Sequence, residues 1–194
     1  MHDPIAKFSQ WFADAKASPA ITEPTAMTLA TATAQGKPSA RIVLLKEHGP
    51  QGFLFYTNLT SRKSGELIAN PQAAVCFYWM PLCRQLRIEG TVVQAADAEA
   101  DAYFASRPRE RQIGAWASLQ SQPLRDRAEL DERAAMLEKR YAGQPIPRPP
   151  HWSGWRLIPR SMEFWLQSEA RLHEREIYTR ADAHAPWQFS LLYP

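Results

Sequence analysis

Two arginines and a histidine alternate near the C-terminus, in the segment Arg171-Leu172-His173-Glu174-Arg175. If this segment is a strand, successive side chains point to opposite faces, so the three basic side chains share one face. They would then lie roughly 7 Å apart and repel one another unless an anion or a polar partner lies among them. The pattern predicts half of a site for an anionic ligand. The alternative is a solvent-facing strand edge whose charges prevent aggregation.

A second basic group begins the segment Ser61-Arg62-Lys63, where a helix is predicted to extend to Asn70 with Ser61 as its N-cap. The start of a helix offers free N–H groups and the positive end of the helix dipole, and the two basic side chains add full charges. This combination is typical of a phosphate site. The alternative is an ordinary capped helix with solvated basic residues. Arg41 lies near the start of a predicted strand that ends at Lys46.

A third polar group lies on the segment from Arg84 to Gly90, where alternation places Gln85, Arg87 and Glu89 on one face. The side-chain amide of Gln85 can both donate and accept hydrogen bonds, which suits the edge of a heteroaromatic ring. The alternative is cross-strand ion pairing, which accounts well for Arg87 and Glu89. Further candidates are scattered along the chain, and each alone is typical of core aromatics or solvated arginines: Tyr103, Arg107, Arg109, Gln120, Ser121 and Trp165.

The elements that must position these residues are mostly short strands. Apolar residues at helical spacing first predict an N-terminal helix that ends near Ser18-Pro19. Strands are predicted at residues 27–33, 40–46, 53–57, 73–79, 85–93, 155–166, 171–178 and 187–192. Turn residues between them favour antiparallel hairpins. Two more helices are predicted at residues 97–106, with Asp97 as the cap, and at residues 122–141.

This pattern predicts a mainly β fold with helical additions (α+β), built as a small β-barrel. We expect one domain over residues 1–194, in which residues 1–25 form the N-terminal helix and linker. Residues 97–143 would be a helical insertion, and the C-terminal strands, residues 155–194, would complete the barrel. The chain has no G-x-G-x-x-G and no Walker loop, so a phosphate would be held largely by side chains.

Composition limits the class of protein. The 194 residues are 45% hydrophobic and 22% charged, as in an ordinary globular protein, and no apolar run reaches the length of a membrane span. The start of the chain lacks the features of a signal peptide, so we expect a cytoplasmic protein.

A net charge of +3 suits small anionic ligands and does not predict nucleic-acid binding. Cys76 and Cys83 have no metal-binding spacing, and we expect both to be reduced and structural.

Taken together, the polar groups match a known family. From about Ala26 to Pro194 the chain resembles the pyridoxine (pyridoxamine) 5′-phosphate oxidase family. The matching motifs occur in the family's order: Arg41–Lys46, Phe55–Asn58, Ser61–Lys63, Arg84–Gly90, Tyr103–Arg109, Gln112–Ser118, Gln120–Ser121, Glu163–Trp165 and Arg171–His173.

The resemblance implies an FMN-binding split β-barrel that forms a homodimer with FMN at the subunit interface. The implied FMN contacts are Arg41, Ile42, Val43, Leu44, Leu45, Lys46, Tyr56, Thr57, Arg62, Lys63, Gln85, Gln120, Ser121, Trp165 and Arg175. The implied substrate contacts are Lys46, Tyr103, Arg107, Arg171 and His173, of which Arg171 and His173 are expected to be catalytic.

The resemblance also implies the reaction. Pyridoxine 5′-phosphate and pyridoxamine 5′-phosphate would lose a hydride from C4′ to N5 of FMN and yield pyridoxal 5′-phosphate. Molecular oxygen would reoxidise the flavin and give hydrogen peroxide. Whether His173 moves a proton or only orients the substrate stays open. The alternatives are a related split-barrel flavoenzyme of the phenazine-biosynthesis type, or a non-catalytic protein that binds FMN or pyridoxal phosphate.

One position departs from the family's motif. A serine completes the family's phosphate site two residues beyond the position of Arg109, and here that residue is Arg111. Arg111 is therefore expected at the substrate phosphate, where a guanidinium binds bidentately if its stem has room. The alternative is that it fills the pocket or turns into solvent and weakens substrate binding.

Overall fold

The computed structural model describes residues 3–194, so Met1 and His2, the first residues of the predicted N-terminal segment, lie outside the described chain. Helix α1 (Pro4–Ala17) begins after Asp3, whose carboxylate accepts a hydrogen bond of 2.9 Å from the Ile5 N–H. Its buried face, which includes Phe8 and Phe12, packs against the sheet, and its C-cap is Ser18. The predicted N-terminal helix is confirmed.

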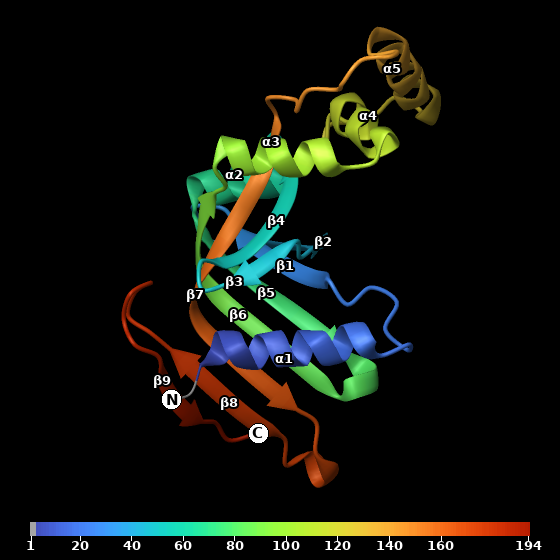
Figure 1. Cartoon of the computed structure of the whole chain (residues 1–194). Coiled ribbons are helices and arrows are strands. Elements are labelled where there is room, and N and C mark those ends of the chain that lie inside the picture. The colour runs from blue at the N-terminus through green and yellow to red at the C-terminus, as the bar shows by residue number, and fades with distance from the viewer. Residues whose placement is uncertain (1–2) are drawn as a thin grey trace.

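The core of the fold is one curled antiparallel sheet (Figure 1). Its strands are β1 (Ala26–Ala32), β2 (Pro38–Leu44), β3 (Glu47–Gly49), β4 (Gly52–Asn58), β5 (Gln72–Trp79), β6 (Arg84–Gln94), β7 (Trp152–Leu166), β8 (Glu174–Thr179) and β9 (Gln188–Leu191). The order is β2-β1-β5-β6-β7-β4-β3, and β8 pairs with both β7 and β9. Burial alternates along β5 and β6, because one face of each strand lies on the core.

Strand β7 gives the sheet its divided form. It pairs along its length with β6, while its first half pairs with β4 and its second half with β8. The sheet therefore splits beyond β7 into two wings, which point to opposite ends of the molecule in Figure 1. The predicted fold, a mainly β split barrel with helical additions, is confirmed.

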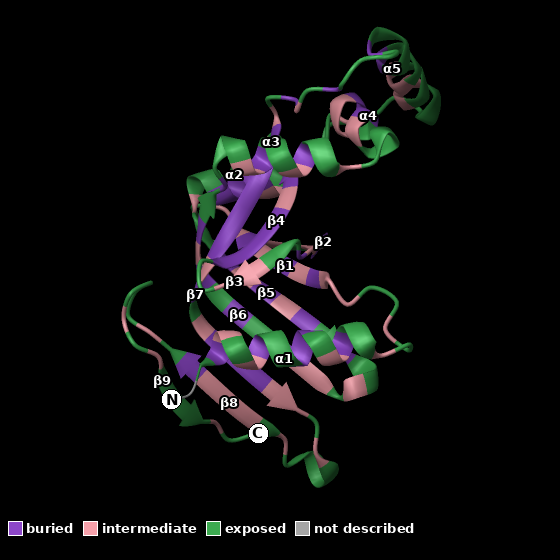
Figure 2. Ribbon diagram, viewed as in Figure 1, coloured by how far each residue is buried: buried purple, intermediate pink, exposed green. Residues whose placement is uncertain are grey.

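The remaining helices gather at the β4 end of the sheet (Figure 1). They are α2 (Arg62–Ala69), α3 (Asp97–Ser106), α4 (Arg109–Ala117) and α5 (Arg127–Arg140). A second apolar cluster, which includes Phe104, Ile113, Leu137 and Trp152, joins α3, α4 and α5 to the start of β7. Figure 2 shows that burial is concentrated along β4 and β7, whereas α5 is largely exposed. Within residues 3–194, no helix is long and apolar enough to span a bilayer.

Two helix predictions were wrong in detail, and one helix was missed. The segment after Arg107 forms α4, which was not predicted as a helix. The helix predicted from residue 122 begins only at Arg127, because Pro123 disfavours helix in the residue before it and the carboxylate of Asp126 accepts from the Glu129 N–H as N-cap. Asp97 is not the cap of α3: that position is Ala96, and Asp97 is in the first turn.

The strand predicted at residues 171–178 is shorter than expected. Ala170 and Arg171 have φ of +53° and +61°, in the left-handed region, and form a short 3-10 turn (Glu169–Arg171). A strand ladder cannot continue through such residues, so β8 begins only at Glu174. Arg171, His173 and Arg175 therefore do not alternate along one strand face. The short strand β3 was not predicted at all.

Candidate active site

A basic cavity of about 280 Å³ lies where β2, β4, α2 and α3 meet. Its lining residues are Ile42, Val43, Leu44, Lys46, Tyr56, Thr57, Lys63, Tyr103, Arg107, Arg111, Gln120 and Trp152. Four of these side chains are cationic and none is a carboxylate. The cavity is therefore suited to an anion of more than one charge.

Stacked aromatic rings form one wall of the basic cavity. The rings of Tyr103 and Tyr56 are 4.2 Å apart, and those of Tyr56 and Trp152 are 5.0 Å apart, both nearly parallel. Gly154 makes this stack possible, because a Cβ there would lie 2.9 Å from Cε1 of Tyr56. Burial raises the pKa of Tyr56 to about 12, so its hydroxyl stays protonated and can donate a hydrogen bond.

Arg107 lies against this wall. Its guanidinium carbon is 4.8 Å from the ring centre of Trp152, and its Nη1 atom is buried without a hydrogen-bond partner anywhere in residues 3–194. Burial is the largest cause that lowers the pKa of Arg107, and Arg111 lowers it further. A buried, unpaired donor is costly, so this guanidinium favours an acceptor in the cavity.

Lys63, at the start of α2, is half-buried and lines the cavity. Its Nζ donates to Oε1 of Gln120 at 2.8 Å and to Oγ1 of Thr57 at 3.0 Å. Burial, followed by the charge of Arg41, lowers the pKa of Lys63 to about 8. An anion bound beside Lys63 would stabilise its charged form.

Ser121, the next residue after Gln120, lies at the start of α2. Its Oγ accepts a hydrogen bond of 3.2 Å from the backbone N–H of Arg62. Ser61 is the N-cap as predicted, although its side chain makes no capping hydrogen bond. Gln120 and Ser121 thus join the segment after α4 to the N-terminus of α2.

Glu66 is a functional candidate that the sequence analysis missed. This buried carboxylate accepts a hydrogen bond from Ser39 at 2.5 Å, one from Nε of Arg62 at 2.9 Å and one from Thr31. These bonds lower the pKa of Glu66 to about 2, although burial alone would raise it. Arg41 Nη2 lies 3.4 Å from the same carboxylate. Arg62 and Arg41 are therefore held beside the basic cavity and do not line it.

A second group of predicted residues, the C-terminal cluster, lies on the other wing of the sheet. It consists of Gln85, Trp165, Arg171, His173 and Arg175. Gln85 pairs with Trp165, and Trp165 with Arg175, so these three form one row across β6, β7 and β8. The turn before β8 supplies the other two, and the ring of His173 lies 4.6 Å from that of Trp165.

Glu163 orients Arg175 in this cluster. Its carboxylate accepts from Nε of Arg175 at 2.9 Å and also pairs with Arg87. Arg175 Nη1 donates to the backbone carbonyl of Tyr193 at 2.7 Å. The ion-pair alternative for Arg87 is thus confirmed, with Glu163 as the partner on the neighbouring strand.

The predicted site residues therefore fall into separate groups. Most of them line the basic cavity, and five form the C-terminal cluster. Leu45 is buried in the main core, while Arg41 and Arg62 bond to Glu66. In Figure 1, α2, α3 and α4, which line the cavity, lie at the opposite end of the molecule from β8, which carries part of the cluster, so one copy does not bring the two groups together. Trp152 was not predicted, although its place at the start of a buried strand could have indicated it.

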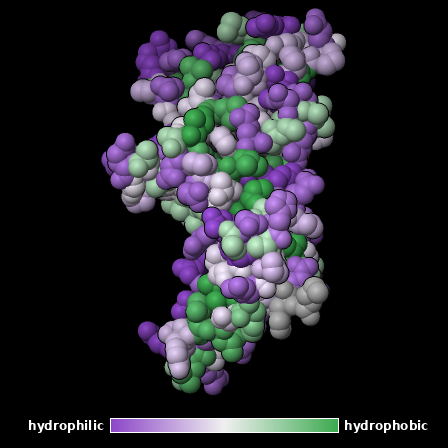
Figure 3. Space-filling model, turned by 90° about the vertical axis from the view of Figure 1, so that its left-hand side faces the viewer, coloured by the Kyte–Doolittle hydropathy of each residue, from purple (hydrophilic) through white to green (hydrophobic). Residues whose placement is uncertain are grey.

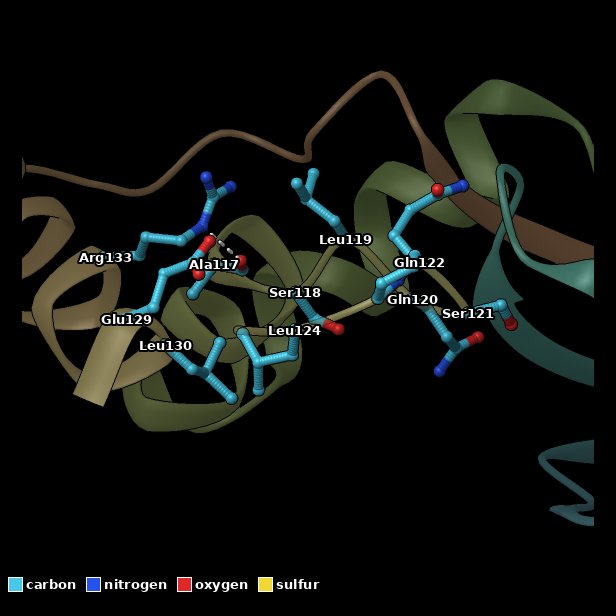
Figure 4. Close-up of a pocket in the computed structure, with 11 residues that line it drawn as sticks. Ala117, Ser118, Leu119, Gln120, Ser121, Gln122, Leu124, Glu129, Leu130 and Arg133 are labelled. Atoms are coloured by element: carbon cyan, nitrogen blue, oxygen red, sulfur yellow. Dashed lines mark hydrogen bonds between the residues drawn. The ribbon is translucent and has the colours of Figure 1, made fainter. Parts of the chain in front are cut away.

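Another cavity, of about 210 Å³, lies between the C-terminus of α4 and α5 (Figure 4). Leu124 and Leu130 form its apolar part, and Arg133 Nε donates to the Ala117 carbonyl at 2.8 Å. Figure 4 shows Gln120 and Ser121 at the far end of the same segment. This cavity lacks the group of cations found in the basic cavity.

Comparison with known proteins gives consistent matches along the chain. The family model described as "Pyridoxamine 5'-phosphate oxidase" matches residues 13–140. A second, "Pyridoxine 5'-phosphate oxidase C-terminal dimerisation region", matches residues 152–194. A protein of Myxococcus xanthus named pyridoxine/pyridoxamine 5′-phosphate oxidase is 55% identical over 192 residues, which are 99% of this chain and 92% of that protein. A protein of the same name from Rhodospirillum rubrum is 53% identical over 197 residues, with 99% and 96% covered.

Solved structures agree with the fold. The crystal structure of PhzG from Burkholderia lata, in complex with tetrahydrophenazine-1-carboxylic acid, has a TM-score of 0.92 and 36% identity. The match covers 99% of this chain and 93% of that one. An FMN-binding protein of Nostoc punctiforme, related to pyridoxamine 5′-phosphate oxidase, has a TM-score of 0.79 over the whole length of both chains. At 15% identity, this second match concerns the fold alone.

Proposed function

We infer that this chain converts pyridoxine and pyridoxamine 5′-phosphates to pyridoxal 5′-phosphate. The premise is that the chain belongs to the pyridoxamine 5′-phosphate oxidase family. The family makes it an oxidoreductase with FMN as cofactor. The observation that carries the proposal is the basic cavity, whose lining includes four cationic side chains and no carboxylate, and where Arg107 Nη1 is buried without a hydrogen-bond partner in residues 3–194. Phosphate groups supply the missing acceptors.

The residues around α2 fit the cofactor. Lys63, at the N-terminus of the helix, is half-buried among neutral partners and beside Arg41, so this end of the cavity also favours an anion. We assign the FMN phosphate to Arg62 and Lys63, with Arg41 in support. Bound FMN would supply the redox chemistry, taking up the hydride that substrate C4′ loses and passing the electrons to molecular oxygen, which would yield hydrogen peroxide.

The other end of the cavity fits the substrate. Lys46, Tyr103 and Arg107 would hold its phosphate, and Arg111 lies on the same wall. Arg171 and His173 would hold the pyridine ring over the flavin. Holding the reacting atoms close together in the right orientation is the main contribution of the protein to the rate.

A second copy of the chain completes this site in the proposal. The C-terminal segment matches a dimerisation region, which supports a homodimer. Figure 3 shows apolar side chains gathered towards the lower end of the molecule, where Figure 1 places β8 and β9. Exposed apolar residues of this part include Leu172 and Leu191. We propose that the C-terminal cluster of one copy faces the basic cavity of the other.

The test is aerobic turnover by the FMN-loaded protein. With pyridoxine 5′-phosphate we expect steady formation of pyridoxal 5′-phosphate and an equal amount of hydrogen peroxide. Unphosphorylated pyridoxine is the control and should be a far poorer substrate, because it lacks the group that the cavity binds. A yellow, folded protein that oxidises neither the alcohol nor the amine substrate would contradict the proposal.

A related activity is the second candidate. PhzG, solved in complex with a tetrahydrophenazine carboxylic acid, shares the fold at 36% identity, against 53–55% for the relatives named oxidases. The phosphate-binding character of the basic cavity favours the oxidase. Turnover of a reduced phenazine carboxylic acid without turnover of either phosphate ester would favour the second candidate instead.

A further inference from the structure

The ring of His173 is held at two places. Its face lies against Trp165, with the ring centres 4.6 Å apart. Its Nδ1 atom accepts a hydrogen bond of 3.3 Å from the backbone N–H of Ser168. This bond closes the turn that contains Ala170 and Arg171, the two residues with left-handed φ. The direction of the imidazole is thus set by the turn that also carries Arg171.

The hydrogen bond also determines where the proton lies. A backbone N–H only donates, so Nδ1 must accept, and in the neutral imidazole the proton then lies on Nε2. Within residues 3–194, the structure shows no hydrogen-bond partner for Nε2, so its N–H can donate to a ligand. A second proton would have to bind at Nδ1, where it would face the N–H of Ser168.

We propose that the Ser168 N–H locks His173 in its Nε2–H tautomer, so that His173 donates a hydrogen bond to an acceptor atom of the substrate ring and does not take up a proton. The identity of the substrate rests on the proposed function. The lock itself rests only on the turn from Ser168 to His173. It decides between the two roles that the sequence leaves open for this histidine.

Two substitutions separate the roles. The amide nitrogen of glutamine reaches about as far as Nε2 and can donate there, whereas asparagine reaches only as far as Nδ1 and can keep the bond to Ser168. We therefore expect His173→Gln to retain kcat within about tenfold of wild type and His173→Asn to lose clearly more. Loss of a general base would instead lower kcat by about 10²–10⁴-fold in both variants.

Either of two results would overturn the proposal. An equal, large fall of kcat in both variants would make His173 a proton acceptor. Higher activity for asparagine than for glutamine would mean that the bond to Ser168 only stabilises the turn. His184→Gln is the matched control, since His184 is exposed and its loss removes a histidine without touching the cluster.

A spectroscopic measurement tests the lock without relying on turnover. Long-range ¹H–¹⁵N correlation spectra of the FMN-loaded protein distinguish the imidazole tautomers, and His173→Gln identifies the signal by its loss. We expect the Nε2–H pattern for His173. An Nδ1–H or doubly protonated pattern at neutral pH would refute the lock. This readout stands even if the protein fails to oxidise pyridoxine 5′-phosphate, so the two failures are distinguishable.

Discussion

At the scale of single residues, Arg111 distinguishes the basic cavity of this chain from the family's motif, which has a serine at this position. It lies in the first turn of α4, is exposed, and lines the cavity beside the half-buried Arg107. No carboxylate of the cavity wall offsets the repulsion between the two guanidiniums. A bound phosphate dianion would turn this repulsion into attraction, because both could donate to its oxygens.

We expect Arg111→Ser to raise KM for pyridoxine 5′-phosphate about tenfold and to leave kcat almost unchanged. The phosphate lies away from the reacting C4′ atom, so the lost contact weakens ground state and transition state alike. Steady-state kinetics measure this difference. Arg125→Ser is the matched control, because Arg125 is exposed and, within residues 3–194, forms an ion pair only with its neighbour Asp126. An unchanged KM would show that Arg111 points into solvent.

Substitutions of Arg62 and of Arg171 are expected to affect different properties of the protein. Arg62→Ala should weaken FMN binding by about 10- to 100-fold, since it removes a charged donor at the N-terminus of α2. Arg171→Ala should lower kcat/KM by at least about 10- to 100-fold, while its flavin content stays near that of wild type. The ratio of flavin to protein after gel filtration separates the effects. Equal loss of flavin in both variants would contradict the division of roles.

The residues that could be predicted from sequence are those whose chemistry is local. The basic residues at the start of α2 and the alternating Gln85 and Arg87 could be found from spacing alone. Glu66 could not, because its importance comes from Arg41 on β2 as well as from Arg62 on its own helix. The turn at Ala170 was hidden for another reason: nothing in that residue type favours a positive φ.

At the scale of elements, the docking of α1 depends on a half-buried histidine. The ring centre of His48 on β3 lies 4.7 Å from that of Phe8 and 5.3 Å from that of Phe12. Its Nε2 atom lies 3.2 Å from Oγ of Ser9. Burial is the main cause that lowers the pKa of His48, and Lys16 adds to it. The folded protein therefore favours the neutral imidazole.

A pH dependence of stability follows from the lowered pKa of His48. In the unfolded chain histidine titrates near its ordinary pKa of about 6.5, so below this pH the unfolded state binds more protons than the folded state. Stability due to neutral His48 is complete above about pH 6.5 and is lost as the pH falls through the lower pKa of the folded protein.

We expect the Tm of wild type to fall by more between pH 7.5 and 5.5 than that of His48→Gln, by a few °C. Thermal unfolding followed by circular dichroism across this range measures the difference. The exposed His184→Gln should retain the wild-type slope. Identical slopes for wild type and His48→Gln would mean that His48 remains accessible to protons in the folded state.

Strands were the most predictable elements, because alternation and turn residues bound them within a few residues of their observed ends. The exceptions are informative. Strand β3 has only three residues, too few to show any period. Helix α4 buries only Ile113 and Ala117, so its apolar pattern is weak, and its place comes from packing against α5 and Trp152. Tertiary contacts decide such elements, and one sequence does not display them.

At the scale of the whole molecule, β7 separates the two halves of the proposed site. Its first half supplies Trp152 to the basic cavity, and its second half supplies Trp165 to the C-terminal cluster. A strand of 15 residues spans roughly 50 Å, so side chains at its two ends cannot meet in one copy. Two copies related by a twofold axis can bring each cluster to the other copy's cavity and form two equal sites.

Mixed dimers test this arrangement. Arg107→Ala damages the basic cavity and Arg171→Ala the C-terminal cluster, so each homodimer should be nearly inactive. If each site combines the cavity of one copy with the cluster of the other, a mixed dimer contains one site with both defects and one intact site. Random assembly makes half of the dimers mixed, so co-expression of the two differently tagged variants should restore about a quarter of wild-type activity.

The matched control pairs two defects in the same half of the site. Co-expression of Arg107→Ala with Lys46→Ala should restore nothing, because every site in that mixed dimer lacks one cavity residue. Recovery in both mixtures would mean that neither single variant abolishes activity. Recovery in neither would place the complete site within one copy, and β7 would then have to bend far more than the extended strand seen here. Recovery only in the first mixture would establish that the enzyme exists as an active unit only when two chains pair.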